Sequence, residues 1–457
     1  MKIEQIYTGC LAQGAYYIES QGEVAIIDPL REVNSYIEKA KRNNAQIKYI
    51  FETHFHADFV SGHVELSQKT SAPIIYGPKA NPTFEALIAT DNQEFKVGNV
   101  TIKVLHTPGH TMESSCYLLL DENQKQVALF SGDTLFIGDV GRPDLAQNGS
   151  LTMADLAGYL YDSLNQKIMP LADDVIVYPA HGAGSACGKN MSKETSDTLG
   201  NQKAVNYALQ PQTREQFIEA VTDGLTPPPF YFPKNVMLNK TGIQAVKGVM
   251  ERGLTAHSPQ EFEDLVNATD TLILDTRKPD AFGKGFIPRS VFIGIDGDFA
   301  PWVGTLVRDI QQEILIVADE GREEEVVKRL ARVGYDNVLG YLKGGIEAWT
   351  ALGRETDEID SVSADEFVEI YKRNRLIIKD VRKTTEFETG HVRDAENIPL
   401  AQISELMTEF DKDEPNYVHC AGGYRSMVAS SILKSRGYHN VVNIEGGYGA
   451  IVKAGLI

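Results

Sequence analysis

Short apolar runs that are typical of buried strands alternate with helical patterns along the chain. Strand-like runs occupy residues 47–51, 100–104 and 127–130, and a turn with polar residues follows each one. Near the other end, a strand-like stretch at 416–418 leads through a glycine-bearing loop into a helix-like stretch at 427–434. Such alternation of strand and helix patterns is typical of α/β domains. We therefore expect an α/β fold in every part of the chain.

The turns after the first three strand-like runs carry side chains that bind metals. These turns hold His54-Phe55-His56-Ala57-Asp58, Pro108-Gly109-His110 and Ser131-Gly132-Asp133. A single pair of histidines would be weak evidence, because isolated histidines are commonly structural. Three such motifs at the ends of buried strands form a set that a scaffold can hold rigidly. The sequence therefore predicts a metal site.

In their order and spacing, these motifs resemble those of the metallo-β-lactamase-fold hydrolases and oxygenases. The resemblance covers residues 1–245 and includes the stretch at 178–182, whose His181 is similar to the late histidine of that family. Dinuclear zinc members carry a further histidine directly after the aspartate, where this chain has Phe59. Phenylalanine has no donor atom, so we expect no complete second metal site.

The remaining ligand set points to one metal ion. Two imidazoles and one carboxylate with open positions suit non-haem Fe(II) and O₂ chemistry, whereas a tetrahedral zinc site would more naturally recruit His56. The segment 138–144 resembles the persulfide dioxygenase branch of this fold. That resemblance implies one Fe(II) per chain, held by His54, His110 and Asp133.

The same resemblance implies roles for nearby residues. His56, Asp58 and His181 would hydrogen-bond bound water and orient the ligands. Arg142, within the matching segment, would either contact substrate or form a salt bridge on its loop, and the sequence leaves both alternatives open. Cys187 follows the late histidine and is expected to be a small buried residue that can lie near the site.

A cysteine opens the loop before the helix-like stretch at 427–434. Cys420 and Arg425 enclose four residues, two of them glycines. Backbone N–H groups and the helix dipole would converge on the sulfur, and the guanidinium would add a fixed charge. All three favour a reactive thiolate over a buried inert thiol. The sequence therefore predicts a nucleophilic cysteine.

Residues 361–457 resemble the rhodanese family of sulfurtransferases, through this loop and the motifs at 380–382 and 397–400. Four enclosed residues is the sulfur-carrying size in that fold, whereas the related phosphatases have one residue more. The resemblance implies that Cys420 and Arg425 are catalytic. It also implies that the substrate-binding residues are Gly422, Gly423 and Tyr424.

Residues 250–355 repeat this pattern. Asp275-Thr276-Arg277 parallels the motif at 380–382, at an offset of roughly 103 residues that marks a tandem domain. Asp319 stands where the cysteine would be, and only two residues separate it from Arg322. We therefore expect this middle domain to be catalytically inactive. It would be either a spacer that docks on the metal domain and positions the Cys420 domain, or an idle duplicate on a flexible tether.

Two segments are expected to link the domains. The segment 225–233 contains Pro227-Pro228-Pro229 and three aromatic residues, so it should be irregular and pack back over the first domain. The segment 356–360 is acidic and is expected to be exposed.

Composition narrows the choice of partners. The net charge is −19 with no basic stripe, which argues against nucleic acid and anionic membrane surfaces. Four cysteines in 457 residues form no disulfide framework. The N-terminus lacks a signal-peptide pattern, and no apolar run approaches ~20 residues. We expect a reduced, cytoplasmic enzyme that assembles as a homo-oligomer.

Together these patterns predict an αββα metallo-β-lactamase sandwich followed by two α/β rhodanese-like domains. The resemblances imply a persulfide dioxygenase that oxidises a thiol persulfide, of glutathione, coenzyme A or a similar carrier, with O₂ to sulfite. The cysteine domain would make or use thiosulfate in sulfide detoxification. Two alternatives remain, a zinc thioester hydrolase of the glyoxalase II type and a non-enzymatic sulfur relay or redox sensor.

Overall fold

A computed structural model describes residues 1–147, 150–243 and 245–456. It divides into two compact units, one of Met1–Val246 with Ala331–Gly334 and one of Lys247–Leu330 with Tyr335–Ile457. The first unit contains two mixed sheets, and the second contains two parallel sheets. The expected fold class is therefore confirmed.

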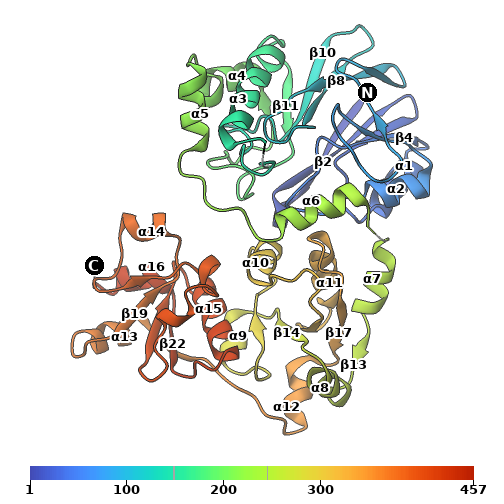
Figure 1. The fold of residues 1–457 in the computed structure, drawn as a ribbon. Coiled ribbons are helices and arrows are strands. Elements are labelled where there is room, and N and C mark those ends of the chain that lie inside the picture. The colour runs from blue at the N-terminus through green and yellow to red at the C-terminus, as the bar shows by residue number, and fades with distance from the viewer. Residues whose placement is uncertain (148–149, 244, 457) are drawn as a thin grey trace. The chain divides into compact units, whose positions relative to one another are not determined.

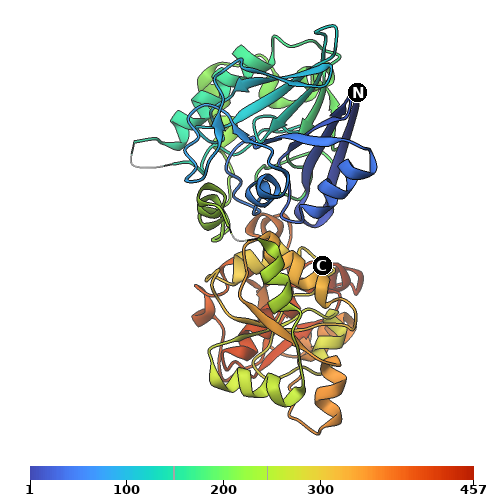
Figure 2. The same cartoon turned by 90° about the vertical axis from the view of Figure 1, so that its right-hand side faces the viewer.

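Two six-stranded sheets form the centre of the first unit (Figures 1 and 2). The first sheet consists, in spatial order, of β1 (Lys2–Thr8), β2 (Gln13–Ser20), β3 (Glu23–Ile27), β4 (Gln46–Phe51), β5 (Ile74–Tyr76) and β6 (Leu87–Ile88). The second consists of β12 (Asp197–Thr198), β11 (Ile176–Pro179), β10 (Gln126–Gly132), β9 (Ser115–Leu120), β8 (Val100–His106) and β7 (Glu94–Val97).

The two sheets pack face to face through aromatic and aliphatic side chains. Tyr16 and Phe51 of the first sheet lie in one buried cluster with Phe95, Tyr117 and Phe130 of the second. The rings of Phe51 and Phe95 meet edge to face, with centroids 5.5 Å apart. Because side chains alternate along a strand, the opposite face of each sheet is left for helices.

Helices cover those outer faces. They are α1 (Asn34–Arg42) and α2 (His63–Thr70) on the first sheet, and α3 (Met153–Ser163), α4 (Leu199–Val205) and α5 (Arg214–Thr222) on the second. Tyr36 of α1 and Leu66 of α2 share a buried cluster with Val24 of β3. Leu160 of α3 and Phe217 of α5 share another with strands β9 and β10. The result is the expected αββα arrangement.

The proline-rich segment 225–233 differs in part from expectation. Residues 225–231 are irregular, but Phe232 and Pro233 begin helix α6 (Phe232–Thr241), because proline is tolerated in the first turn of a helix. Tyr231 and Phe232 are buried as expected, whereas Phe230 is 48% exposed. The segment therefore packs within the first unit through two of its three aromatic rings.

The second unit contains two five-stranded sheets whose strands are all parallel. One consists of β13 (Ala256–His257), β17 (Val338–Leu342), β16 (Ile314–Val317), β14 (Leu272–Asp275) and β15 (Val291–Phe292). The other consists of β18 (Asp360–Val362), β22 (Val441–Ile444), β21 (Asn416–His419), β19 (Ile377–Asp380) and β20 (Glu396–Asn397). The strand order is the same in both, which confirms the internal repeat.

Helices flank both of these sheets. In the first half they are α7 (Val246–Gly253), α8 (Pro259–Ala268), α9 (Pro279–Gly283), α10 (Phe299–Leu306), α11 (Glu323–Arg332) and α12 (Gly345–Ala351). In the second half they are α13 (Ala364–Tyr371), α14 (Thr384–Thr389), α15 (Tyr424–Ser435) and α16 (Gly447–Lys453).

The acidic segment 356–360 is bound more closely than its charge suggests. Asp357 and Phe286 exchange two backbone hydrogen bonds of 2.9 Å, and the Asp357 carboxylate accepts a 2.9 Å bond from Lys434. Thr356, Glu358 and Asp360 are exposed as expected, whereas Asp357 is partly buried and Ile359 is buried, so the expectation holds for only part of the segment. Phe286 and Asp357 form an isolated antiparallel β-bridge, which pairs backbone groups of the segment that would otherwise need water as a partner.

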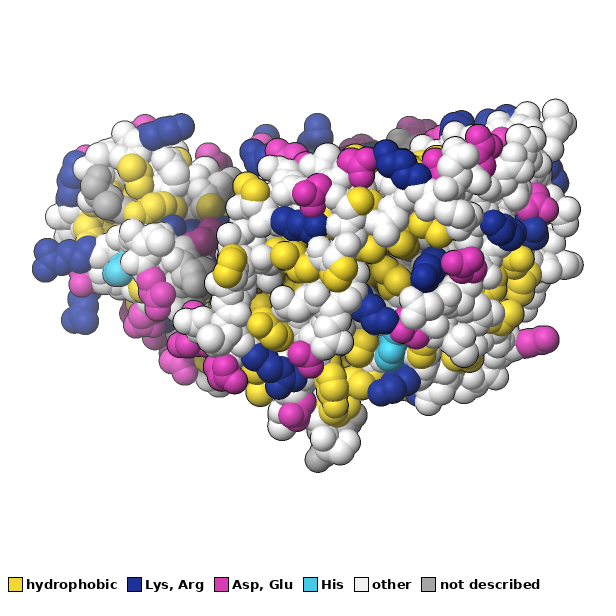
Figure 3. Space-filling model, turned by 90° about the horizontal axis from the view of Figure 1, so that it is seen from above, with side chains coloured by type: hydrophobic (Ala, Val, Ile, Leu, Met, Phe, Trp, Pro, Cys, Tyr) yellow, Lys and Arg dark blue, Asp and Glu magenta, His cyan; other side chains and the backbone are white. Residues whose placement is uncertain are grey.

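Charged side chains of both signs lie on the surface. Figure 3 shows acidic and basic side chains interspersed over the visible face. Within the described residues, no helix is both long and apolar enough to cross a membrane.

We expect replacement of Phe130 by alanine to destabilise the first unit by about 3–5 kcal/mol, because its buried ring packs against Tyr16 and Tyr178. Urea unfolding followed by circular dichroism measures this change. The control is replacement of Tyr159 by alanine, because this residue of α3 is 39% exposed. It should change the free energy of unfolding by less than about 0.5 kcal/mol. Equal shifts in the two variants would contradict the assignment of Phe130 to the core.

Candidate metal centre and cysteine loop

The topology of the first unit brings the predicted metal-binding turns to one edge. Strand β10 runs parallel to β11, and β8 has the same direction because both β8 and β10 are antiparallel to β9. The chain leaves β8, β10 and β11 toward His110, Asp133 and His181 respectively. The turn after β4 in the facing sheet supplies His54, and these four side chains are buried together.

Asp133 lies between three imidazoles. Its Oδ2 atom is 3.8 Å from Nε2 of His54 and 3.4 Å from Nε2 of His110. Its Oδ1 atom is 3.5 Å from Nε2 of His181, which is also 3.5 Å from Oδ2 of Asp58. The candidate ligand atoms of His54, His110 and Asp133 all lie within 4.8 Å of one another. This spacing suits a single metal ion.

Backbone and hydroxyl oxygens fix the orientation of these rings. Nδ1 of His110 lies 2.8 Å from the carbonyl oxygen of Arg142, and Nδ1 of His181 lies 3.3 Å from that of Ala12. A carbonyl can only accept, so each Nδ1 carries the proton and each Nε2 keeps a lone pair.

His54 follows the same rule through a hydroxyl group. Thr53 donates its single hydroxyl proton to Asp28 over 2.9 Å and therefore accepts from Nδ1 of His54 over 3.0 Å. Burial and the neighbouring imidazoles keep the pKa of His54 well below its usual value, which favours the neutral ring that binds a metal. All three Nε2 atoms thus offer lone pairs to the same cluster.

Several polar atoms at this cluster are buried and unpaired within the described residues. They include both carboxylate oxygens of Asp133 and Nε2 of His181. Buried polar atoms normally have hydrogen-bond partners. The atoms that face one another here carry lone pairs with no hydrogen atom between them, and a metal ion is the partner that such a set can bind. The donor set therefore fits a metal ion.

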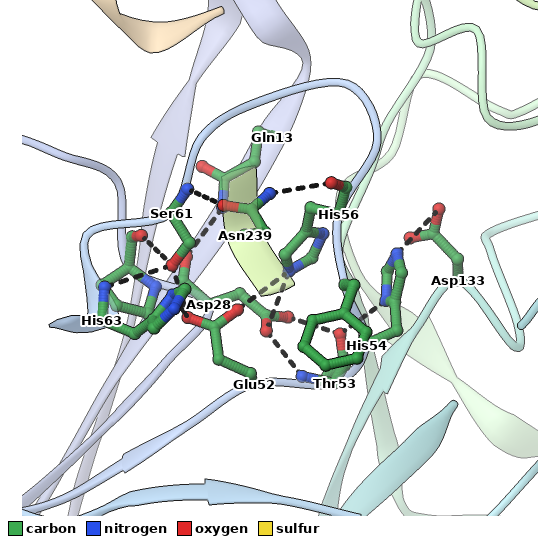
Figure 4. Close-up of polar contacts among 12 residues, drawn as sticks. Gln13, Asp28, Glu52, Thr53, His54, His56, Ser61, His63, Asp133 and Asn239 are labelled. Atoms are coloured by element: carbon green, nitrogen blue, oxygen red, sulfur yellow. Dashed lines mark hydrogen bonds and ion pairs between the residues drawn. The ribbon is translucent and has the colours of Figure 1, made fainter. Parts of the chain in front are cut away.

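His56 turns toward a different pair of acids. Its Nε2 atom is 3.1 Å from Asp28 and 3.5 Å from Glu52 (Figure 4). Burial alone disfavours the charged ring, but these carboxylates together with Asp58 raise the pKa of His56 to about 9. Phe59 packs against the ring of His56, with centroids 4.3 Å apart.

Two further groups of candidate ligands adjoin the first. His56, Asp58 and His181 form one, and Asp133, His181 and Cys187 form the other. Cys187 is buried as expected, and burial together with Asp58 and Asp133 raises the pKa of its thiol well above the usual value. Phe59 is fully buried beside these groups and offers no donor atom to either of them.

Arg142 is held by its own loop. Its guanidinium donates to both carboxylate oxygens of Asp144, at 2.6 and 2.7 Å, and to the carbonyl oxygens of Ala186 and Thr226. Of the two alternatives that the sequence left open, this geometry favours the salt bridge. Arg142 still serves the site, because its carbonyl oxygen orients His110.

Sequence reasoning missed Asn239 on helix α6. Its amide donates to the carbonyl oxygens of His56 and Phe59, at 2.8 and 2.7 Å, and accepts from the N–H of Ser61 at 2.8 Å (Figure 4). No local sequence pattern predicts this role, because Asn239 lies far along the chain from the turn to which it is hydrogen-bonded. Asp28 was also missed, although it directly follows a buried strand as the predicted ligands do.

A small cavity of about 160 Å³ opens beside His110. Its wall contains Phe55, Ala57 and Val236, together with the charged residues Glu113 and Lys240. A substrate with both an apolar part and charged groups could bind there next to the metal ligands.

Gly109 allows the turn that carries His110 to lie close to helix α3. Its φ is +148°, and a Cβ atom there would lie 2.5 Å from the backbone of Leu160 in α3. Only glycine allows this contact between the turn and the helix. The close packing places His110 against the inside of the unit rather than in solvent.

In the second unit, Cys420 follows β21 and precedes α15, as expected. Its sulfur accepts a 3.1 Å hydrogen bond from the N–H of Gly423 and lies 3.7 Å from the hydroxyl of Ser426. Gly423 has a φ of +103°, which turns its N–H toward the sulfur at the start of the helix. Arg425 forms a bidentate ion pair with Glu386 at 2.6 and 2.8 Å.

Of the predicted binding residues of this loop, Gly422 and Tyr424 line one pocket with the predicted catalytic residues Cys420 and Arg425, whereas Gly423 is not part of that lining. The equivalent loop of the middle domain has no such arrangement. There Arg322 is bound to Glu325 and to Asp296, and Asp319 is exposed.

Comparisons with known proteins find two kinds of domain in this chain. Residues 8–181 match the metallo-beta-lactamase superfamily, and residues 258–352 and 363–454 each match the rhodanese-like domain. A solved metallo-beta-lactamase from Staphylococcus aureus subsp. aureus COL is 32% identical, with a TM-score of 0.66, and the match covers 75% of this chain and 98% of that one.

Curated relatives of the first unit are named as hydrolases. A probable hydroxyacylglutathione hydrolase of Schizosaccharomyces pombe is 34% identical over 161 residues, which are 34% of this chain and 58% of that protein. A hydroxyacylglutathione hydrolase of Tolumonas auensis is 33% identical over 169 residues, which are 36% of this chain and 60% of that protein. The chain thus spans about 60% of the length of these relatives.

We expect replacement of Asn239 by alanine to weaken metal binding about tenfold or more, because three backbone groups of the ligand turn lose their partner. Titration of the metal-loaded protein with a chromogenic chelator measures the affinity. Asn235, equally buried on α6 but without a hydrogen-bond partner for its amide among the described residues, gives the matched control. An equal loss in Asn235→Ala would mean that α6 acts by packing alone.

Proposed function

Since the chain belongs to the metallo-β-lactamase superfamily and continues into two rhodanese-like domains, we propose that it is a persulfide dioxygenase fused to a sulfurtransferase. One thiol persulfide, one O₂ and one water would give one thiol, one sulfite and two protons. The observation that carries the proposal is the set His54, His110 and Asp133, on a chain that also carries the Cys420 loop.

The donor set supports one iron ion. Two imidazoles and one carboxylate on one face suit Fe(II), which would supply O₂ binding and activation beside the persulfide. His56, the residue that a third zinc imidazole would require, has Nε2 directed at Asp28 and Glu52. Phe59 occupies the position of a further ligand without offering a donor atom.

The chain's own residues would bind and orient the persulfide. The apolar side chains Phe55 and Val236 would exclude water from the sulfur, and Lys240 would attract a carboxylate of the thiol carrier. His56, Asp58 and His181 would hold water and the ligand rings in place. A low-molecular-weight thiol such as glutathione fits these features.

Cys420 would transfer a sulfane sulfur. Its thiolate attacks the outer sulfur of a persulfide, the S–S bond breaks, and the carrier leaves as a thiolate that takes up a proton. The N–H of Gly423 stabilises the sulfur anion before and after transfer. The Cys420 persulfide could then pass its sulfur to sulfite and form thiosulfate, and fusion keeps both steps at high effective concentration.

The middle domain would not take part in this chemistry as a second catalyst. It has Asp319 in place of cysteine, and the loop arginine Arg322 is occupied by acidic partners. Carboxylates at that position would repel a sulfur anion.

The names of the curated relatives, which are hydroxyacylglutathione hydrolases, favour one rival function, that of a thioester hydrolase. Metal analysis of the purified protein distinguishes the persulfide dioxygenase from the thioester hydrolase. We expect one iron per chain and O₂ uptake on addition of glutathione persulfide or coenzyme A persulfide. Two tightly bound zinc ions with thioesterase activity would instead establish the hydrolase.

Replacement of His110 by alanine should abolish O₂ uptake and leave sulfur transfer by Cys420 unchanged, because the two sites lie in separate cores. An oxygen electrode measures the first activity and thiocyanate formation from thiosulfate measures the second. Loss of both activities would contradict the independence of the sites.

Replacement of Cys420 by serine should abolish sulfur transfer while O₂ uptake continues, with sulfite replacing thiosulfate as the main product. Ion chromatography of the products shows the change. Cys10→Ser, which removes a partly exposed thiol of the first unit, should leave the product ratio unaltered. An unchanged ratio in Cys420→Ser would refute the relay from the iron site to the cysteine.

A further inference from the structure

The middle domain contributes a wall to the pocket of Cys420. The pocket has a volume of about 610 Å³, and its lining includes Gly297, Asp298 and Trp302 from the middle domain. The other lining residues belong to the cysteine domain and are Lys383, Glu386, Cys420, Gly422, Tyr424 and Arg425. A catalytically silent domain therefore helps to shape the place where sulfur would be transferred.

This wall is held by buried contacts between the two halves of the second unit. Tyr424, in the cysteine loop, donates a 2.9 Å hydrogen bond to the carbonyl oxygen of Gly294. The hydroxyl of Ser431 in α15 accepts a 2.9 Å bond from the N–H of Phe292, and both residues are fully buried. A Cβ atom on Gly297 would lie 2.8 Å from the Tyr424 ring, so these backbones approach closely.

The pocket is larger than an inorganic sulfur donor requires. A volume of about 610 Å³ lies in the range of sites for organic ligands, whereas thiosulfate is a small dianion. Trp302 supplies an aromatic surface, and it is only partly buried, unlike Trp349 in the domain core. A planar ring at a pocket wall suits the carbon chain of a thiol carrier.

The charges on the wall are divided between the domains. Arg425 and Glu386 neutralise each other in their bidentate pair. That pairing leaves Lys383 on the cysteine domain and Asp298 on the middle domain as the other charged lining residues. Asp298 begins helix α10 without making a side-chain capping bond, so its carboxylate is not committed to the helix.

We propose that Asp298 and Trp302 of the middle domain select the sulfur donor of Cys420, and that this donor is an organic persulfide carrying an ammonium group. Asp298 pairs with the ammonium, Trp302 covers the carbon chain, and Lys383 receives a carboxylate where the carrier has one. The proposal rests on sulfur transfer by Cys420. It makes the duplicated domain a specificity element in addition to a spacer.

The transfer itself needs no further reactant. The Cys420 thiolate forms a bond to the outer sulfur, the S–S bond of the donor breaks, and the carrier thiolate departs with the bonding electron pair. Asp298 and Trp302 touch only the carrier, so they affect its binding and leave the chemistry at sulfur to the loop.

Two matched probes test the charge selection in the full-length protein. Cysteamine persulfide carries an ammonium group, and 3-mercaptopropionate persulfide carries a carboxylate on a chain of similar length. Mass spectrometry of the added sulfur on Cys420 gives kcat/KM for each. We expect Asp298→Asn to lower the cysteamine-to-mercaptopropionate ratio about three- to fivefold, as for a solvent-exposed ion pair.

Both kcat/KM values of a ratio are measured on the same protein preparation. A partly unfolded fraction therefore lowers both values by the same factor and leaves their ratio unchanged. Asp264→Asn, an exposed change on α8 outside the pocket, should keep the wild-type ratio. Trp302→Ala should reduce kcat/KM for both organic persulfides more than for thiosulfate. An unchanged ratio in Asp298→Asn, or equal losses for all donors in Trp302→Ala, would overturn the proposal.

The outcome also separates this proposal from the proposed function. If wild-type Cys420 gains no sulfur from any donor, sulfur transfer itself fails and the selection by Asp298 fails with it. If Cys420 gains sulfur but the ratio is insensitive to Asp298, only the role of the middle domain is refuted.

Discussion

The metal centre depends on one constraint. Each imidazole must donate a hydrogen bond from its Nδ1–H to an oxygen atom outside the cluster. The carbonyl oxygens of Arg142 and Ala12 and the hydroxyl of Thr53 accept from Nδ1 of His110, His181 and His54. Every Nε2 atom then keeps a lone pair directed at the same small space as Asp133. Without these outer acceptors the rings could turn or exchange tautomers, and the buried carboxylate would face donors instead of lone pairs. The surrounding turns serve to hold these acceptors at fixed positions.

That requirement explains why elements distant in the chain meet around the site. Asp28, at the end of β3, fixes the proton of Thr53, and Asn239 on α6 fixes the backbone of the turn that carries His56. Backbone N–H groups of this turn have partners outside it, since Thr53 donates to Asp28 and Ser61 donates to Asn239. Amide and carboxylate groups from other elements thus satisfy its backbone. The extension after the αββα sandwich is thus a support for the candidate site and not only a link to the second unit.

The second unit contains two similar rhodanese-like folds whose loops differ. The cysteine loop presents the N–H of Gly423 to a sulfur, whereas the corresponding arginine of the middle domain, Arg322, is bound to Glu325 and Asp296. The middle domain packs against α15 and places Asp298 and Trp302 in the wall of the pocket.

The sequence alone determined the α/β alternation, the tandem repeat and the local motifs through periodicity and spacing, and the resemblance of those motifs to known families implied the αββα sandwich and the rhodanese-like folds. The strands before His54, His110 and Asp133 and the cysteine loop before α15 were all visible as local patterns. Tertiary structure decided what local patterns cannot encode: the partners of Asn239 and Asp28, the salt bridge that occupies Arg142, and the meeting of Asp298 with Cys420 in one pocket. Burial of Tyr231 and exposure of Phe230 likewise followed from packing. Such contacts join residues far apart in the chain, and only the packing of sheets and helices brings them within hydrogen-bonding distance.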